Sequence, residues 1–139
     1  PLNRLAETIL ESGGEGIHAM RDPTRGGLAA ALNEFAEAAG VGIEIREKSI
    51  PVNDPVAGAC ELLGLDPLYV ANEGKLVAVV APEVASRVLE EMRRNPLGQD
   101  AVVIGEVAPR RRPLVSMKTR IGGMRIVDML VGEQLPRIC

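Results

Sequence analysis

The chain has 139 residues, a formal net charge of -3 and a pI of about 5.3, which fits one domain and excludes the basic surface of a typical nucleic-acid-binding protein. Hydrophobic residues make up 46% of the chain but aromatic residues only 1%, so aliphatic side chains must fill the core and almost no ring is available to stack on bases. Two cysteines make no disulfide framework, and no apolar run reaches ~18 residues, so we expect a cytoplasmic protein without a membrane span.

The first half of the chain contains apolar residues at helical spacing in three segments and strand-like apolar runs in two others. Glycines follow several of these segments, as they often do at helix ends. We therefore expect the order helix 2–11, strand 17–20, helix 26–39, strand 41–46 and helix 56–63.

In the second half, the continuous apolar run at 75–81 predicts a central strand that is covered on both faces. The further expected elements are a helix opened by Pro82, strands over 101–107 and 114–118 with the arginines 110–112 in a hairpin loop between them, and an apolar stretch over 124–130. Alternating helices and strands that end in hairpins predict the α+β class, with helices packed against a mixed sheet.

The sequence Asp-Pro-Thr-Arg-Gly-Gly, at the start of the second helix, is the first candidate site. Gly26 and Gly27 allow the backbone to approach a ligand, and free N–H groups at a helix start favour anions such as phosphate. Arg25 can add a bidentate hydrogen-bonded contact to a phosphate. The motif is not a Walker loop, because no Gly-Lys-Ser/Thr follows. The alternative is an ordinary turn in which Asp22 or Thr24 caps the helix.

A second candidate site is the sequence Asn-Glu-Gly-Lys, which begins at Asn72 directly before the apolar run. Catalytic side chains often lie in loops at the ends of strands. Glu73 can serve as a general base if burial makes its carboxylate a better proton acceptor. The alternative is a polar turn with Gly74 at positive φ and Glu73 in water.

The third candidate is the thiol of the last residue, Cys139. Terminal residues are seldom held in a core, a prenylation signal would need the cysteine four residues from the end, and no second cysteine or histidine stands nearby for a metal site. From Gly132 to Cys139 an extended chain spans up to ~25 Å. We therefore expect a domain over 1–131 and a flexible tail over 132–139 that carries a group on Cys139. The alternative is an exposed thiol without a role.

Three segments together carry a family resemblance: MRDPTRGGLA from Met20, YVANEGK from Tyr69, and the ending GEQLPRIC. They resemble the HypE family of hydrogenase maturation proteins, within the superfamily of aminoimidazole ribonucleotide synthetase, selenophosphate synthetase and thiamin monophosphate kinase. The resemblance implies the C-terminal α+β domain of that superfamily. The N-terminal domain, which supplies most of the ATP and Mg²⁺ site and the contact of a homodimer, would be absent, so this chain alone is expected to be inactive.

The resemblance also implies an activity, the ATP-dependent dehydration of a carboxamide on Cys139 to a thiocyanate. A partner carbamoyltransferase would load the thiol, and an iron-scaffold complex would accept the cyanide as a ligand of a [NiFe] centre. Glu73 matches the base in the Asn-Glu-Gly position of the family. The residues implied on the ATP side are Asp22, Thr24, Arg25, Gly26, Gly27 and Asn72, and no metal ligand is assigned within the chain.

Two other hypotheses are open at this point. The protein could be another ATP-using member of the superfamily that acts on a small phosphorylated or selenium substrate, in which case Cys139 would be dispensable. It could also be a non-catalytic carrier module whose cysteine is loaded and unloaded by other proteins. The ending Pro-Arg-Ile-Cys argues against the first, and replacement of Glu73 would separate the second from an enzyme.

Overall fold

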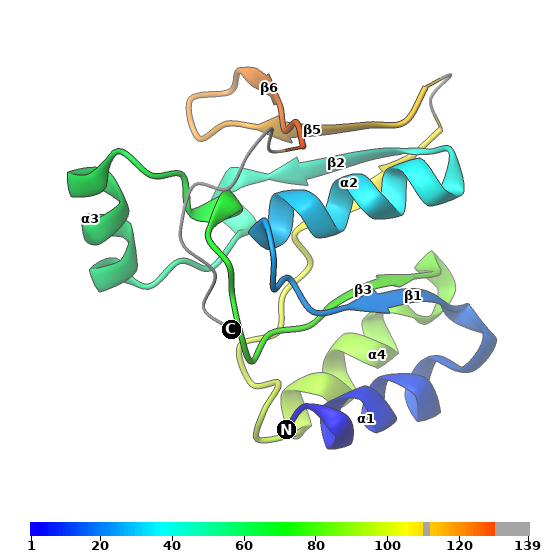
Figure 1. Cartoon of the computed structure of the whole chain (residues 1–139). Helices are drawn as coiled ribbons and strands as arrows, with labels where there is room; N and C mark the ends of the chain where they lie inside the picture. The colour runs from blue at the N-terminus through cyan, green and yellow to red at the C-terminus, as the bar shows by residue number, and fades with distance from the viewer. Residues whose placement is uncertain (110–111, 130–139) are drawn as a thin grey trace. The chain divides into compact units, whose positions relative to one another are not determined.

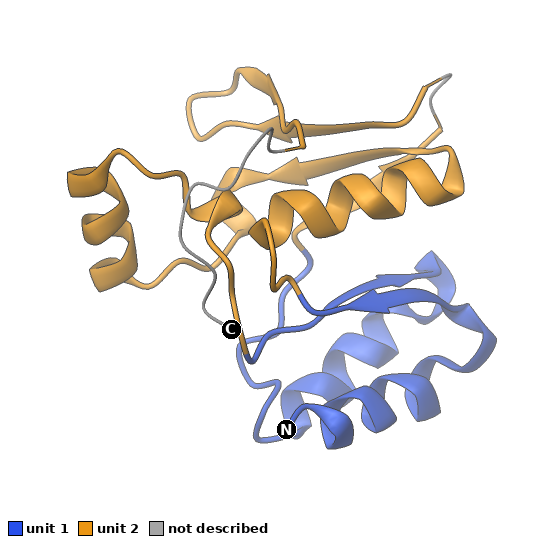
Figure 2. Cartoon of the chain, viewed as in Figure 1, with its two compact units in different colours: residues 1–22, 74–103 blue, residues 23–73, 104–139 orange. Residues whose placement is uncertain are grey.

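The computed structural model describes residues 1–109 and 112–129 (Figure 1). The chain divides into two compact units, each built from two separate segments (Figure 2). Unit 1 contains residues 1–22 and 74–103, and unit 2 contains residues 23–73 and the described residues from 104 onward. Among the described residues no helix is long and apolar enough to cross a bilayer.

Unit 1 combines two helices with a two-stranded antiparallel sheet. Its elements are α1 (Asn3–Gly13), η1 (Gly14–Gly16), β1 (Ile17–Arg21), β3 (Val77–Val80) and α4 (Pro82–Arg94). Leu5 and Ile9 lie one turn apart on α1 and form a buried cluster with Val88 of α4. Pro82 occupies the first turn of α4, as predicted, where its missing N–H costs nothing.

The strand β3 differs from its prediction. A central strand covered on both faces was expected, but within the described part of the chain β3 pairs with β1 alone. All four of its residues are half-buried, so neither of its faces is fully covered. The continuous apolar run therefore indicates a strand that is partly buried but not central in a sheet. A short strand that packs beside two helices has the same apolar composition as a central strand.

Unit 2 is a four-stranded mixed sheet in the order β4-β2-β5-β6. Its elements are α2 (Gly27–Ala39), β2 (Gly42–Arg46), η2 (Glu47–Ser49), α3 (Asp54–Leu63), η3 (Pro67–Tyr69), β4 (Gly105–Ala108), β5 (Leu114–Lys118) and β6 (Met124–Ile126). β2 runs parallel to β5 and antiparallel to β4, and β5 runs antiparallel to β6. The predicted α+β class with a mixed sheet is confirmed.

The prediction of a hairpin between the strands on either side of the arginines 110–112 is wrong. β4 begins at Gly105 rather than near 101, and it does not pair with β5, because β2 lies between them. The connection therefore crosses one strand of the sheet instead of turning back on itself. Residues 110 and 111 lie outside the described part of the chain.

The core of unit 2 lies between α2 and one face of its sheet (Figure 1). Alternate residues of β2 and β5 form the buried face of the sheet: Ile43, Ile45, Val115 and Met117. The residues of α2 that share the buried face are mostly small, which allows the helix to lie close to the strands: Ala29, Leu32 and Ala36. In α3, Cys60 is buried, as predicted for a small core residue, whereas the rest of that helix is exposed.

Candidate functional site

The helix α2 begins with two consecutive glycines in the left-handed conformation. Gly26 has φ of 67° and Gly27 has φ of 62°, which are angles that other residues rarely adopt. No side chain caps this helix start, so the alternative in which Asp22 or Thr24 acts as the cap is wrong. A helix start without a side-chain acceptor retains the N–H groups that an anion such as phosphate can accept from.

Gly27 is also closely packed. A Cβ atom at this position would lie 2.5 Å from the carbonyl oxygen of Leu68 and 2.6 Å from that of Val70. Contacts this short do not occur between real atoms, so only glycine allows the start of α2 to lie against the backbone of η3 and the residues after it.

A hydrogen bond joins the two candidate loops. The N–H of Asn72 donates to the carbonyl oxygen of Pro23 at 3.0 Å. Together with the packing of Gly27, this contact brings the glycine turn and Asn72, the first residue of the Asn-Glu-Gly turn, side by side within unit 2. The two motifs are separated by about 45 residues in sequence, and their proximity is the main geometric feature of the site.

The remaining predicted residues differ in exposure. Thr24 and Asn72 are half-buried, whereas Arg25 and Glu73 are exposed. Gly74 has φ of 73°, so the expected polar turn is present at this position, with the Glu73 side chain at the surface of unit 2. An exposed carboxylate becomes an effective base only when a bound substrate or another part of the protein covers it.

Two predicted residues are not brought into this arrangement. Asp22 is exposed and belongs to unit 1, directly before the chain passes into unit 2. Cys139 and the predicted tail over 132–139 lie outside the described residues.

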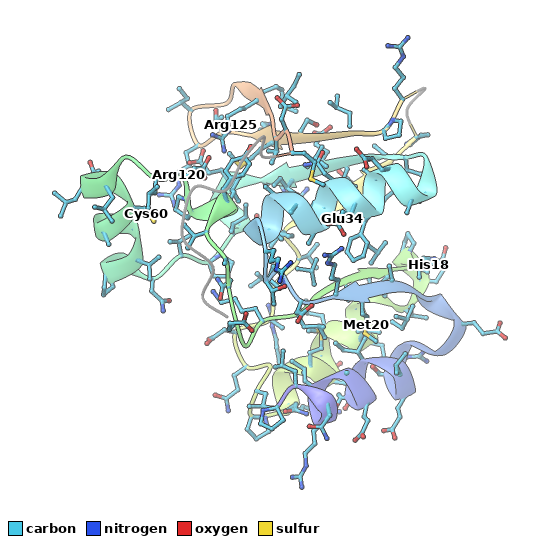
Figure 3. All side chains as sticks on the ribbon, in the orientation of Figure 1. His18, Met20, Glu34, Cys60, Arg120 and Arg125 are labelled. Atoms are coloured by element: carbon cyan, nitrogen blue, oxygen red, sulfur yellow. The ribbon has the colours of Figure 1, made fainter. Side chains whose placement is uncertain are left out.

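A charged group lies on the other side of η3 and was missed by the sequence analysis. Arg125 of β6, labelled in Figure 3, forms an ion pair with Asp66 at 2.7 Å, and Asp66 also accepts a hydrogen bond from the N–H of Leu68 at 3.0 Å. Burial raises the pKa of Tyr69, and the nearby Arg125 partly offsets this effect. The backbone of Asp128 also offsets part of the rise in the Tyr69 pKa. The only available signal was that Tyr69 is the single tyrosine of the chain.

The described residues fit part of an ATP site. The uncapped start of α2 provides N–H donors for phosphate oxygens, and Arg25 provides a positive charge beside them. No group of three or more His, Cys, Asp or Glu side chains converges among the residues that the structure describes.

Comparison with known proteins gives consistent matches. Residues 2–118 match the family of AIR synthase related proteins, C-terminal domain. Carbamoyl dehydratase HypE from Bradyrhizobium diazoefficiens is 59% identical over 138 residues, which are 99% of this chain and 40% of that protein. The chain thus spans about two-fifths of the length of that curated relative.

Solved structures of HypE proteins are also similar to this chain. A crystal structure of the hydrogenase maturation protein HypE in complex with ATP is 44% identical with a TM-score of 0.90, and the match covers 99% of this chain and 42% of that one. A chain in a crystal structure of a HypE–HypF complex is 46% identical with a TM-score of 0.88, and the match covers 94% of this chain and 42% of that one. With every described helix, every described strand except β6 and the two adjoining loops inside the matched range, the chain belongs to the family of AIR synthase related proteins, C-terminal domain.

Proposed function

We propose that this chain is the C-terminal domain of a HypE-type carbamoyl dehydratase, which uses ATP to convert a carboxamide on Cys139 into a thiocyanate and thereby supplies cyanide to iron in [NiFe] hydrogenase maturation. The observation that carries the proposal is the joining of the uncapped glycine start of α2 to the Asn-Glu-Gly turn. The 59% identity to a carbamoyl dehydratase over nearly the whole chain supports the same assignment.

Each loop would have a distinct role. The N–H groups of Gly26 and Gly27 would hold phosphate oxygens, and Arg25 would stabilise the charge that develops on them. Thr24 and Asn72, both half-buried beside this turn, would complete the ATP side, with Asp22 at the junction that leads into it.

The reaction needs a leaving group and a base. ATP supplies the phosphoryl group that converts the amide oxygen of the loaded Cys139 into phosphate, a good leaving group. Glu73 would take the two amide protons, one as the oxygen is phosphorylated and one as phosphate leaves, so that the carbon–nitrogen triple bond forms. The products are the thiocyanate on Cys139, ADP and hydrogen phosphate, which keeps one of the two amide protons, while Glu73 passes the other to solvent.

A tail would explain why the reacting group is at the chain end. With a domain over 1–131 and a tail over 132–139, one thiol can visit a loading partner, the ATP site and an acceptor in turn. The HypE–HypF complex supports a stable contact with another maturation protein, which we assign as the carbamoyltransferase. We place the Mg²⁺ ligands, most ATP contacts and the homodimer interface in an N-terminal domain, and an iron-scaffold complex as the acceptor.

A full-length protein that contains this chain tests the proposal through Glu73→Gln, which keeps the shape of the side chain but removes the base. We expect the transferase to load Cys139 as in the wild type, and the ATP-driven loss of water to slow by about 10²–10⁴-fold, the usual contribution of a general base. Mass spectrometry of the C-terminal peptide follows both steps. Equal dehydration rates in both proteins would contradict the enzymatic role and favour a carrier module.

A further inference from the structure

The phosphate-side turn, which runs from Pro23 to Gly27, lies against one other segment of unit 2. At one end of the turn, a Cβ on Gly27 would lie 2.5 Å from the carbonyl oxygen of Leu68. At the other end, the carbonyl oxygen of Pro23 accepts a hydrogen bond from the N–H of Asn72 at 3.0 Å. The two segments therefore run side by side in opposite directions. We call the segment from Leu68 to Asn72 the support segment.

The support segment begins inside η3, and Asp66 holds that turn. Its side-chain Oδ1 atom accepts a hydrogen bond from the N–H of Leu68 at 3.0 Å, and its main-chain carbonyl accepts one from the N–H of Tyr69 at 3.0 Å. Among the helices and 3-10 turns that the structure describes, η3 alone has a side-chain cap. The uncapped start of α2 thus packs on an element that is itself capped.

Arg125 of β6 holds the other oxygen of the same carboxylate. Its guanidinium lies 2.7 Å from Oδ2 of Asp66, a distance typical of a charge-assisted hydrogen bond. The ion pair between Arg46 and Glu106 in the same sheet is longer, at 3.9 Å. The side chain of Asp66 is 28% exposed and that of Arg125 is 43% exposed, so water screens the pair only in part. One carboxylate therefore links a strand of the sheet to the turn that carries the support segment.

We propose, on the basis of the proposed function, that Asp66 and Arg125 are positioning residues, which hold the support segment so that the phosphate-side turn and Glu73 keep the spacing that the reaction needs. The support segment contacts the turn at Gly27 and through Asn72, and Glu73 is the next residue of the chain after Asn72. A shift of this segment therefore moves the phosphate-binding N–H groups and the base relative to each other. A displacement of about 1 Å can lower the rate of an enzyme by about 10²-fold.

Two variants weaken the support from different elements, in a full-length protein that contains this chain. Asp66→Ala removes both the cap of η3 and the ion pair, and Arg125→Gln removes the ion pair alone. Arg125→Lys is the conservative variant, because it keeps a positive charge beside the carboxylate. The matched control is Arg94→Gln in α4 of unit 1, which removes two ion pairs of 2.6 Å within that helix, to Glu90 and Glu91.

The first measurement is hydrogen exchange at the N–H of Asn72, whose own acceptor on Pro23 is present in every variant. We expect exchange to accelerate by about fivefold or more in Asp66→Ala and by about twofold in Arg125→Gln, because the support segment opens more often. Arg125→Lys should exchange close to the wild-type rate, and Arg94→Gln at that rate. Unchanged exchange in both Asp66→Ala and Arg125→Gln would overturn the proposal, and Arg125→Gln decides it alone if Asp66→Ala does not fold.

The second measurement separates positioning from general stability, at a temperature where every variant is fully folded. We expect Asp66→Ala to raise the KM for ATP and to slow the dehydration step, each by about threefold or more, and Arg125→Gln to do so by about twofold, whereas Arg94→Gln keeps both wild-type values. A role in stability alone would leave both constants unchanged. Faster exchange with wild-type kinetics would therefore overturn the positioning role and leave the proposed function intact. If the wild-type protein itself performs no ATP-driven dehydration, the proposed function is wrong, and the positioning role is wrong with it.

Discussion

Gly27 and Gly40 have nearly the same backbone conformation but different surroundings. Their φ angles are 62° and 67°, yet a Cβ at Gly27 would collide with the carbonyls of Leu68 and Val70, whereas nothing lies within 4 Å of a Cβ at Gly40. Substitutions at these two glycines therefore separate the free-energy cost of the left-handed conformation from the cost of the close packing at Gly27.

Gly27→Ala is expected to destabilise the chain by about 2–5 kcal/mol, because strain and overpacking add, whereas Gly40→Ala should cost only about 1–2 kcal/mol from strain. Denaturant unfolding of both variants measures the difference. Equal losses of stability would show that the start of α2 does not depend on its approach to η3.

Tyr69 provides a spectroscopic probe of η3, because it is the only tyrosine and the chain has no tryptophan. Its pKa is raised above the ordinary value of 10.0, chiefly by burial. The folded state thus holds the phenol proton more tightly than the unfolded chain. The resulting stability is fully present below pH 10 and is lost as the pH rises through the folded pKa.

An absorbance titration of the phenol should therefore show ionisation at higher pH in the folded chain than in denaturant. Arg125→Gln should raise the Tyr69 pKa further, because the guanidinium lowers it in the wild type. Titration at the ordinary value in the folded wild type, or a downward shift in the variant, would contradict the placement of Tyr69.

At the scale of elements, α2 and α3 differ in how many of their residues are buried. α2 has five buried residues and packs along the sheet, whereas Cys60 is the only buried residue of α3. Helix stability in proteins comes mainly from packing of this kind. We expect the amides of α3 to exchange with solvent faster than those of α2, as measured by hydrogen exchange resolved by segment. Slower exchange in α3 would mean that its exposed face is covered.

The elements also show what the sequence could and could not predict. The helices α2 and α4 follow from their spacing of apolar residues and from their flanking glycine and proline, which are local signals. The pairing of β4 with β2, the two-stranded pairing of β3 and the bond from Asn33 to Val127 depend on residues far apart in the chain. No local pattern encodes such pairings, so these features were missed or wrongly predicted.

The candidate site was predicted in its parts but not in its arrangement. The glycine turn and the Asn-Glu-Gly turn were recognisable because few residue types suit a positive φ or a strand end. Their proximity follows from the bond between Asn72 and Pro23 and from the packing of Gly27, which only the folded chain provides.

At the scale of the whole molecule, the chain spans about two-fifths of the length of its curated relatives, and we propose that it holds only the phosphate side of the ATP site. We therefore expect this chain alone to release no phosphate from ATP above background. A full-length protein that contains it should do so when Cys139 is loaded. A phosphate-release assay compares the two, and hydrolysis by the isolated chain would show that the site is complete without an N-terminal domain.

The most direct test of the account is the mass of the C-terminal peptide of the full-length protein, measured after loading by the carbamoyltransferase and again after ATP is added. The account predicts a carboxamide on Cys139 that then loses one water, and no adduct in Cys139→Ala. An adduct that ATP leaves unchanged, or hydrogenase maturation that proceeds normally with Cys139→Ala, would contradict it.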